Sequence, residues 1–473
     1  MEAFILVPFA TQSYKSRSLP VSSQRVVNMF AEAQPQSAKS PVSIFGMPGL
    51  TQFATAGSGP IRGVWNMNEI LFVVSGGSLY SVDSNGISTF LGSTISGSGA
   101  VSMADNGTQL CIVNGVNGYI YSVDTGFVRI TDPNFHPASS VTFMDGYFIF
   151  NWVGTNKFFI SNLLDGLTYD ALGYASAEVL SDFVLAVLNQ QENLLIFGAR
   201  SIETWYDSGD TNFPFARYDG ATIERGIAAS LALVKEDNSV FFLGNDLIFY
   251  RLNGVVPVRV STFALEAEWQ QYATISDAYC FSLTYEGHKW VHLVFPSANK
   301  TWVYDIATDL WHERESSNMD GSTMGRWRGN CFIQCYGKLI IGDAYTNQVG
   351  FYDSSVYSEY GYPIIAELVS PPTHADRHRV FFRKFELDVE TGVGITTGQG
   401  SDPQIMLNWS DDGGRTYSEL QPWHTMGKIG AYLTRLRWLR MGQARQRVWK
   451  VTISDPVRRT IIASSVDMEA GTN

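Results

Sequence analysis

One pattern recurs seven times between Gly76 and Tyr352, and it constrains the fold more than any other feature of the chain. Each copy contains a turn, a short apolar strand and an aromatic residue that is often followed by Asp. The aromatic anchors lie about 38 to 54 residues apart: Tyr80, Tyr121, Phe159, Tyr206, Tyr250, Tyr304 and Tyr352. A four-stranded propeller blade uses roughly 40 to 50 residues. The repeat therefore predicts an all-β protein built on a β-propeller of about seven blades.

Turn residues inside the repeat support this prediction. Ile70–Ser75 is typical of a buried strand, and Gly76-Gly77, Asn106-Gly107 and Asn117-Gly118 are typical of tight hairpin turns. Helical periodicity is weak, and its best candidate is the short segment 263–272. A propeller closes its ring by pairing its last blade with its beginning, which removes exposed strand edges. We expect either the N-terminal segment or the strand near Ile61 to complete the last blade.

The sequence divides into three parts. Residues 1–58 are polar with weak periodicity and are expected to form an N-terminal arm on the main body or on a neighbour, whereas residues 59–365 hold the propeller. The repeat stops after Pro363, and Pro371-Pro372 marks a linker. New strands then begin with VFFRKFELDV (380–389). Residues 366–473 therefore predict a separate β-sandwich of ordinary domain size.

Charge is low overall and unevenly placed. The net charge is −12, and charged residues make up 16% of the chain, against about 25% in typical proteins. This composition fits a surface partly covered by other subunits, and it fits a large core equally well. From Arg415 to Arg459, however, the sequence contains ten Lys or Arg residues and only two acidic residues, Glu419 and Asp455. The basic stretch is either a solvated strand face or a contact with an acidic neighbour, and its candidate interface residues are Arg435, Arg437, Arg440, Arg445 and Arg447.

The four cysteines do not suggest a disulfide framework in a chain of this length. We expect Cys111, Cys280, Cys331 and Cys335 to be reduced residues of the core. The apolar run 4–10 has no preceding basic region, so no signal peptide is predicted. No run of about 20 apolar residues predicts a membrane span.

Three motifs could carry chemistry, and each has a structural interpretation. SDDGGRTY (410–417) matches the Asp-box spacing found in sialidase propellers, where the box shapes a hairpin loop. The pairs His288/His292 and His374/His378 could each supply two metal ligands, but no third ligand is evident, so packed or surface histidines are expected. The sequence contains no P-loop and no dinucleotide fingerprint. We therefore expect no enzyme activity, no cofactor and no metal.

Several landmarks, taken in order, resemble the tail hub of short-tailed bacteriophages, a family also called packaged DNA stabilisation proteins. VNMFAEAQP (27–35) and FGMPGL (45–50) resemble that family's N-terminal arm, and NWSDDGGRTYS (408–418) resembles its C-terminal domain. The main body is matched by IRGVW (61–65), GGSLY (76–80), GSGAVSMADNG (97–107), SIETWY (201–206) and ERGIAAS (224–230). Residues 265–400 match least.

The resemblance implies a structural virion protein without catalytic residues. In that family a ring similar to a hexamer attaches below the portal and its adaptor ring, holds the tail needle and neighbours the tailspikes. It closes the channel after packaging and forms part of the DNA exit path. An acidic lumen wall would weakly repel duplex DNA, so DNA would pass without specific binding, and the basic C-terminal region would face a protein partner. No membrane contact is implied.

Two other functions remain open from the sequence. The Asp box and the 13% aromatic content also suit a carbohydrate-binding or sialidase-like propeller, such as a phage receptor-binding component. A sialidase would need an arginine cluster that grips a carboxylate, and the spacing in the propeller region reveals none. A propeller scaffold of a cell is the third class.

Overall fold

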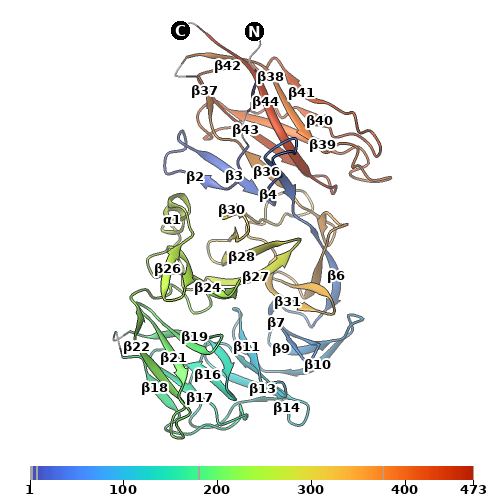
Figure 1. Cartoon of the computed structure of the whole chain (residues 1–473). Helices are drawn as coiled ribbons and strands as arrows, with labels where there is room; N and C mark the ends of the chain where they lie inside the picture. Colours follow the sequence, from blue (N-terminus) through green and yellow to red (C-terminus); the bar gives the residue numbers. More distant parts are fainter. Residues whose placement is uncertain (1–3, 7–8, 179, 181, 376–377, 472–473) are drawn as a thin grey trace.

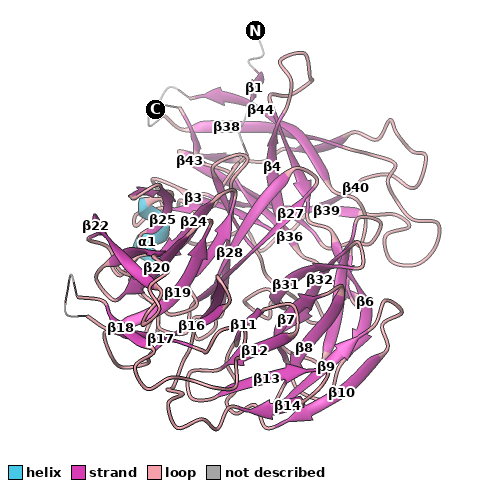
Figure 2. Ribbon diagram, turned by 60° about the horizontal axis from the view of Figure 1, so that its bottom comes forward, coloured by secondary structure: helices cyan, strands magenta, loops and turns pink. Residues whose placement is uncertain are grey.

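The computed structural model describes residues 4–6, 9–178, 180, 182–375 and 378–471. A ring of small sheets forms one end of the molecule and a two-layered β-sandwich forms the other, with N-terminal strands between them (Figure 1). In the view of Figure 2, the sheets surround a common centre like the blades of a propeller. The all-β prediction is confirmed: α1 (Phe263–Trp269), within the segment expected to be helical, is the one α-helix among the described residues.

Blades one to five are four-stranded antiparallel sheets whose strands follow chain order. Blades one and two contain β7 (Ile61–Met67), β8 (Ile70–Ser75), β9 (Ser78–Val82), β10 (Ser88–Ser93), β11 (Ser102–Asp105), β12 (Gln109–Val113), β13 (Gly118–Ser122) and β14 (Gly126–Arg129). Blades three and four contain β15 (Val141–Met144), β16 (Tyr147–Asn151), β17 (Lys157–Ile160), β18 (Tyr174–Ser176), β19 (Val184–Gln190), β20 (Asn193–Gly198), β21 (Ile202–Asp207) and β22 (Phe215–Ile223). Blade five contains β23 (Leu233–Glu236), β24 (Ser239–Leu243), β25 (Phe249–Asn253) and β26 (Val256–Arg259). Each second strand is apolar and buried, as the repeat predicts.

Blades six and seven complete the ring, and blade seven takes one strand from outside the repeat. Blade six contains β27 (Tyr279–Tyr285), β28 (His288–Phe295), β29 (Lys300–Asp305) and β30 (Leu310–Glu313). Blade seven contains β31 (Gly329–Cys335), β32 (Lys338–Asp343) and β33 (Gln348–Asp353). Its fourth strand is β6 (Gly49–Thr55), which pairs antiparallel with β33. The N-terminal segment therefore closes the propeller, which was one of the two expected routes. The short strands β34 (Ser358–Glu359) and β35 (Tyr362–Pro363) extend this sheet.

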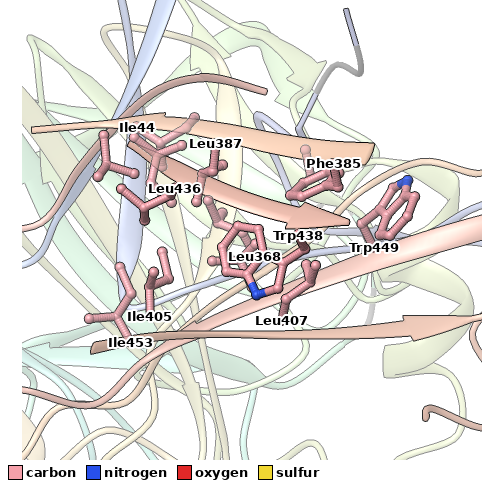
Figure 3. Packing of buried hydrophobic residues seen from close by; sticks show 14 of the residues in the cluster. Ile44, Leu368, Phe385, Leu387, Ile405, Leu407, Leu436, Trp438, Trp449 and Ile453 are labelled. Carbon is pink, nitrogen blue, oxygen red and sulfur yellow. The ribbon is translucent and has the colours of Figure 1, made fainter. Parts of the chain in front are cut away.

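The sandwich consists of two sheets over one core. One sheet contains β36 (Ala366–Val369), β43 (Gln446–Ile453), β39 (Gln404–Ser410) and β40 (Trp423–Thr425), and β37 (Thr373–His374) pairs with β43. The other contains β4 (Met29–Ala33), β5 (Val42–Gly46), β44 (Thr460–Ala470), β38 (Val380–Val389) and β41 (Leu436–Leu439), with β1 (Phe4–Leu6) on β44 and β42 (Gln443–Ala444) on β38. Alternate residues of both sheets point inward, and Phe385, Trp438 and Trp449 form the aromatic part of the core (Figure 3).

One N-terminal strand joins the two bodies. β3 (Ser23–Val27), which forms a hairpin with β2 (Tyr14–Lys15), lies between β30 of blade six and β36 of the sandwich. An 11-stranded sheet therefore runs without interruption from the propeller into the sandwich. Because β4, β5 and β6 also pair with later strands, residues 14–55 contribute to both bodies.

Candidate protein-interaction surfaces

Arg25 holds the junction between the propeller and the sandwich. Its guanidinium donates to both carboxylate oxygens of Glu313 at 3.0 and 2.6 Å, and to Glu315 and Glu367 at 3.0 Å each. Glu313 ends β30 and Glu367 lies in β36, so one cation on β3 ties together three neighbouring strands. Such bidentate, charge-assisted bonds are among the stronger hydrogen bonds in proteins. The sheet register thus brings a charge network to the place where the two bodies meet.

The electrostatics of this network follow from burial. The Glu313 carboxylate raises the pKa of Arg25 well above its usual value, and this effect outweighs the cost of burying the guanidinium. For Glu313, burial alone would raise the pKa, but Arg25 and Lys300 outweigh it and hold the pKa below its usual value. Both groups are therefore charged at neutral pH, and each stabilises the other's buried charge.

The Asp box (410–417) closes a loop and packs against the turn of the N-terminal hairpin formed by β2 and β3. Asp412 accepts hydrogen bonds from the backbone of Arg415 and Thr416 and from two side-chain hydroxyls. These hydrogen bonds lower the pKa of Asp412 far below its usual value, and the bond from the Ser410 hydroxyl has the largest effect. A Cβ atom on Gly413 would come within 2.8 Å of Pro20 Cα, at the turn between β2 and β3. The box is therefore structural, as predicted, and gives no catalytic group.

The predicted interface arginines do not form one patch. Arg435 is exposed and pairs with Glu386 at 2.8 Å. Arg437 and Arg440 are exposed near it, and Arg445 lies elsewhere, at the rim of a hollow of about 760 Å³ between the hairpin turn and the sandwich. Within the described part of the chain, none of these last three has an ion-pair partner. Their role as an interface stays a prediction.

Arg447 differs from the other four because its side chain points into the sandwich. It is 2% exposed, pairs with Asp411 at 2.6 Å and lies over the Phe382 ring at 4.5 Å. A guanidinium held this way is not accessible to a partner. Position in the sequence gave no sign of this, because β43 alternates inward and outward and the basic residues fall on both faces.

The sequence did not predict an apolar surface beside these arginines. The loop between β40 and β41 exposes Ile429, Tyr432 and Leu433 at 60, 71 and 99% of their surface, and Trp423 and Leu439 lie nearby at 58 and 62%. Single exposed apolar residues are common, but a group of them is characteristic of interaction sites. The signal available in the sequence was the run IGAYL (429–433), whose apolar residues lie between Gly427 and a basic strand.

The paired histidines do not converge. His292 is fully buried and its ring stacks on Phe281 at a centroid distance of 4.5 Å. His288 donates to or accepts from Asp305 through Nδ1 at 2.6 Å and lies 3.7 Å from Glu32. His374 and His378 are exposed near the linker. Among the described residues, no group of three His, Cys, Asp or Glu side chains is arranged to hold a metal ion.

The four cysteines are free thiols, as expected. Cys111 and Cys335 are buried, and Cys280 and Cys331 are partly buried. Burial raises the pKa of the Cys331 thiol to about 12, so that thiol stays protonated and unreactive at neutral pH. No helix in the described part of the chain is both long and apolar enough to span a membrane.

The architecture defines a class of structural protein. A closed propeller shares a sheet with a β-sandwich, and the Asp box serves the fold. Family models of bacteriophage P22 Gp10 match the chain as a β-propeller over residues 7–357 and as a β-sandwich over residues 366–469. The chain belongs to this family of phage proteins that stabilise packaged DNA, the tail hubs of short-tailed phages. It is a structural component of a phage tail.

Two solved structures that align with this chain share little sequence with it. A computationally designed protein, Ika8, aligns with 75% of this chain and 100% of its own at 11% identity and a TM-score of 0.39. The extracellular domain of a putative hybrid two-component system from B. thetaiotaomicron aligns with 85% of this chain and 56% of its own, at 10% identity and a TM-score of 0.42. No curated protein matches the sequence.

Proposed function

We propose that the chain is the hub that closes the portal channel after DNA packaging and connects the portal's adaptor ring to the tail needle and tailspikes. The family match over both bodies carries this proposal. Copies of the chain form a ring in the virion, similar to a hexamer. The protein is made in the host cytoplasm and is then built into the tail, where the ring becomes part of the DNA ejection path.

Two features of the chain support a connector. The 11-stranded sheet makes the propeller and the sandwich one body, so a load on one is transmitted to the other. Among the described residues, no group of three His, Cys, Asp or Glu side chains could hold a metal ion. The Asp box is used to seat the N-terminal hairpin, so it gives no support to a sialidase-like function.

The test is genetic complementation. A phage of the same type that lacks its hub gene is supplied with this chain from a plasmid, and particles are purified. We expect the chain to be present in particles and to keep their DNA protected from nuclease. Particles that fill with DNA and lose it although the folded chain is abundant would contradict the proposal. A tail protein outside this family, expressed at the same level, is the negative control.

A further inference from the structure

The sandwich ends in an apolar loop that is bordered by cations. We name this surface the sandwich tip: Lys428, Ile429, Tyr432, Leu433, Arg435 and Arg437. β40 and β41 are the terminal strands of their sheets, so no further strand covers this edge. Leu433 is 99% exposed, and the loop extends away from the rest of the molecule (Figure 1).

The loop is held in a defined shape. Thr391 Oγ1 donates to the carbonyl of Tyr432 at 2.8 Å, and Thr434 Oγ1 donates to the carbonyl of Ala431 at 2.9 Å. The Tyr432 ring lies against Gly392, where an added Cβ would come within 2.7 Å of it. A surface that is ordered before binding loses less conformational freedom when a partner docks. The exposed apolar side chains are therefore presented in place and ready for contact.

A complementary surface lies at the opposite end of the molecule, on the turns of blades three and four. We name it the blade rim: Asp145, Leu163, Leu164, Glu192 and Asp207. Leu163 and Leu164 are 60 and 59% exposed, and the backbone N–H of Leu164 donates to Gly146 at 2.7 Å, which fixes them beside Asp145. Within the described residues, the three carboxylates have no ion-pair partner.

The carboxylates of the blade rim repel one another. Partial burial raises the pKa of Asp145, and the nearby Asp207 and Glu192 raise it further. A cation placed over this surface would relieve the repulsion. The sandwich tip offers the exposed cations Lys428 and Arg437, together with Arg435, which also pairs with Glu386 of its own chain. The two surfaces are thus complementary in hydrophobicity and in charge: each has exposed apolar side chains, and the cations of the sandwich tip have the opposite sign to the carboxylates of the blade rim.

We propose that the sandwich tip of one copy docks on the blade rim of the next copy. The two surfaces lie at opposite ends of one molecule (Figure 1), so they can meet only between molecules. The charge of the two parts of the chain supports this contact. Residues 366–473 contain 14 Lys or Arg and 12 Asp or Glu, whereas residues 1–365 contain 19 Lys or Arg and 33 Asp or Glu. Contact between two different surfaces is heterologous, and such contacts build a ring when the rotation from copy to copy closes. The inference rests on the proposed ring and names the contact that forms it.

The closing experiment begins with a photo-cross-linking amino acid in place of Leu433 in the full chain. The purified protein and purified particles are irradiated, and the linked peptides are mapped by mass spectrometry. We expect links to residues 141–165 or 185–210 of a second copy. The same amino acid at Val116, an exposed propeller residue (64%) in the turn between β12 and β13, is the control and should not link to the sandwich. Links from position 433 to another virion protein, to DNA, to lipid or to a second sandwich tip would overturn the proposal, as would no link in either sample.

Charge reversal supplies an independent readout. We expect Arg435→Glu with Arg437→Glu, or Asp145→Lys with Glu192→Lys, to lower the yield of the tip-to-rim link at least tenfold. Combining all four changes should restore the yield to within about threefold, because each surface then meets its complement again. The double variant Arg415→Glu with Arg458→Glu reverses two exposed cations away from the tip and should leave the yield unchanged. A four-change variant that stays as low as either pair would overturn the proposal.

The outcomes also separate this inference from the proposed function. If the unmodified chain restores DNA retention but position 433 links elsewhere, the hub function stands and the docking proposal fails. If the chain restores nothing while the tip-to-rim link forms in the purified protein, the proposed function fails and the contact remains.

Discussion

At the scale of single residues, Arg25 has more consequence than any of the exposed arginines. Its guanidinium is the only charged group in the described chain that contacts Glu313, Glu315 and Glu367 together. Glu313 has 6% of its side chain exposed, and a buried carboxylate without its cation is costly. Exposed pairs such as Lys39–Asp388, by comparison, contribute little to stability.

We expect Arg25→Met to lower the free energy of unfolding by about 2 to 3 kcal/mol. The full cost of an unpaired buried charge is about 3 to 5 kcal/mol, and the estimate is reduced because Arg25 keeps 29% of its side chain exposed and Lys300 remains near Glu313. Urea denaturation measures the change. Lys39→Met removes an exposed pair with Asp388 and should change the value by less than about 1 kcal/mol. Equal effects of the two variants would contradict the role given to Arg25.

The same pair makes a pH prediction. The pKa of Glu313 is lower in the folded protein than its usual value of 4.5, so its contribution to stability is fully present above that value. It is lost as pH falls through the folded pKa, because the unfolded state takes up the proton at a higher pH than the folded state does. We expect the stability of the wild type to fall more steeply below about pH 4.5 than that of Arg25→Met. Parallel curves from denaturation at several pH values would contradict this.

At the scale of elements, the Asp-box loop positions the β2–β3 hairpin. Gly413 has a φ of +79°, and Pro20 leaves no room for a side chain there. Gly430 has a φ of +81° and open space around it. The two positions therefore carry the same backbone strain on substitution, but one of them also contacts the hairpin.

We expect Gly413→Ala to increase hydrogen–deuterium exchange in residues 14–24, because the added methyl group displaces the hairpin turn. Gly430→Ala is the matched control: it should cost similar backbone strain, about 1 kcal/mol, without changing exchange in the hairpin. Faster hairpin exchange in both variants would mean that general destabilisation, and not the contact with Pro20, is responsible.

Repeats and long-range pairings differ in how far the sequence predicts them. The seven blades follow from local signals, since each Tyr or Phe anchor lies in a strand bounded by its own turns. The position of β3 was not predictable, because Arg25 finds its partners about 290 to 340 residues later and no local pattern encodes such a pairing. Clustering in the sequence nominated Arg435 and Arg437 as interface residues, and that role stays a prediction. It could not show that Arg447 is buried or that Leu433 is fully exposed.

At the scale of the whole molecule, the shared sheet predicts cooperative unfolding. β3 is bonded to blade six on one side and to the sandwich on the other, so neither body can lose that edge without affecting the other. We expect one transition in scanning calorimetry. Val26→Pro removes the backbone N–H that donates to Ser13 Oγ at 2.9 Å and places a rigid ring in the middle of this strand. It should separate the trace into two transitions. Two transitions in the unmodified protein would show that the bodies unfold independently.

The placement of β3 to β6 also determines when these strands can pair during synthesis of the chain. β3, β5 and β6 leave the ribosome before the propeller blades, yet they pair with β30, β33, β36 and β44, which are translated hundreds of residues later. At about 5 to 20 residues per second, the leading segment waits on the order of tens of seconds before its neighbours exist. A nascent chain therefore cannot complete these pairings in the order of synthesis, because β3, β5 and β6 stay without those neighbours until residues far downstream have been translated.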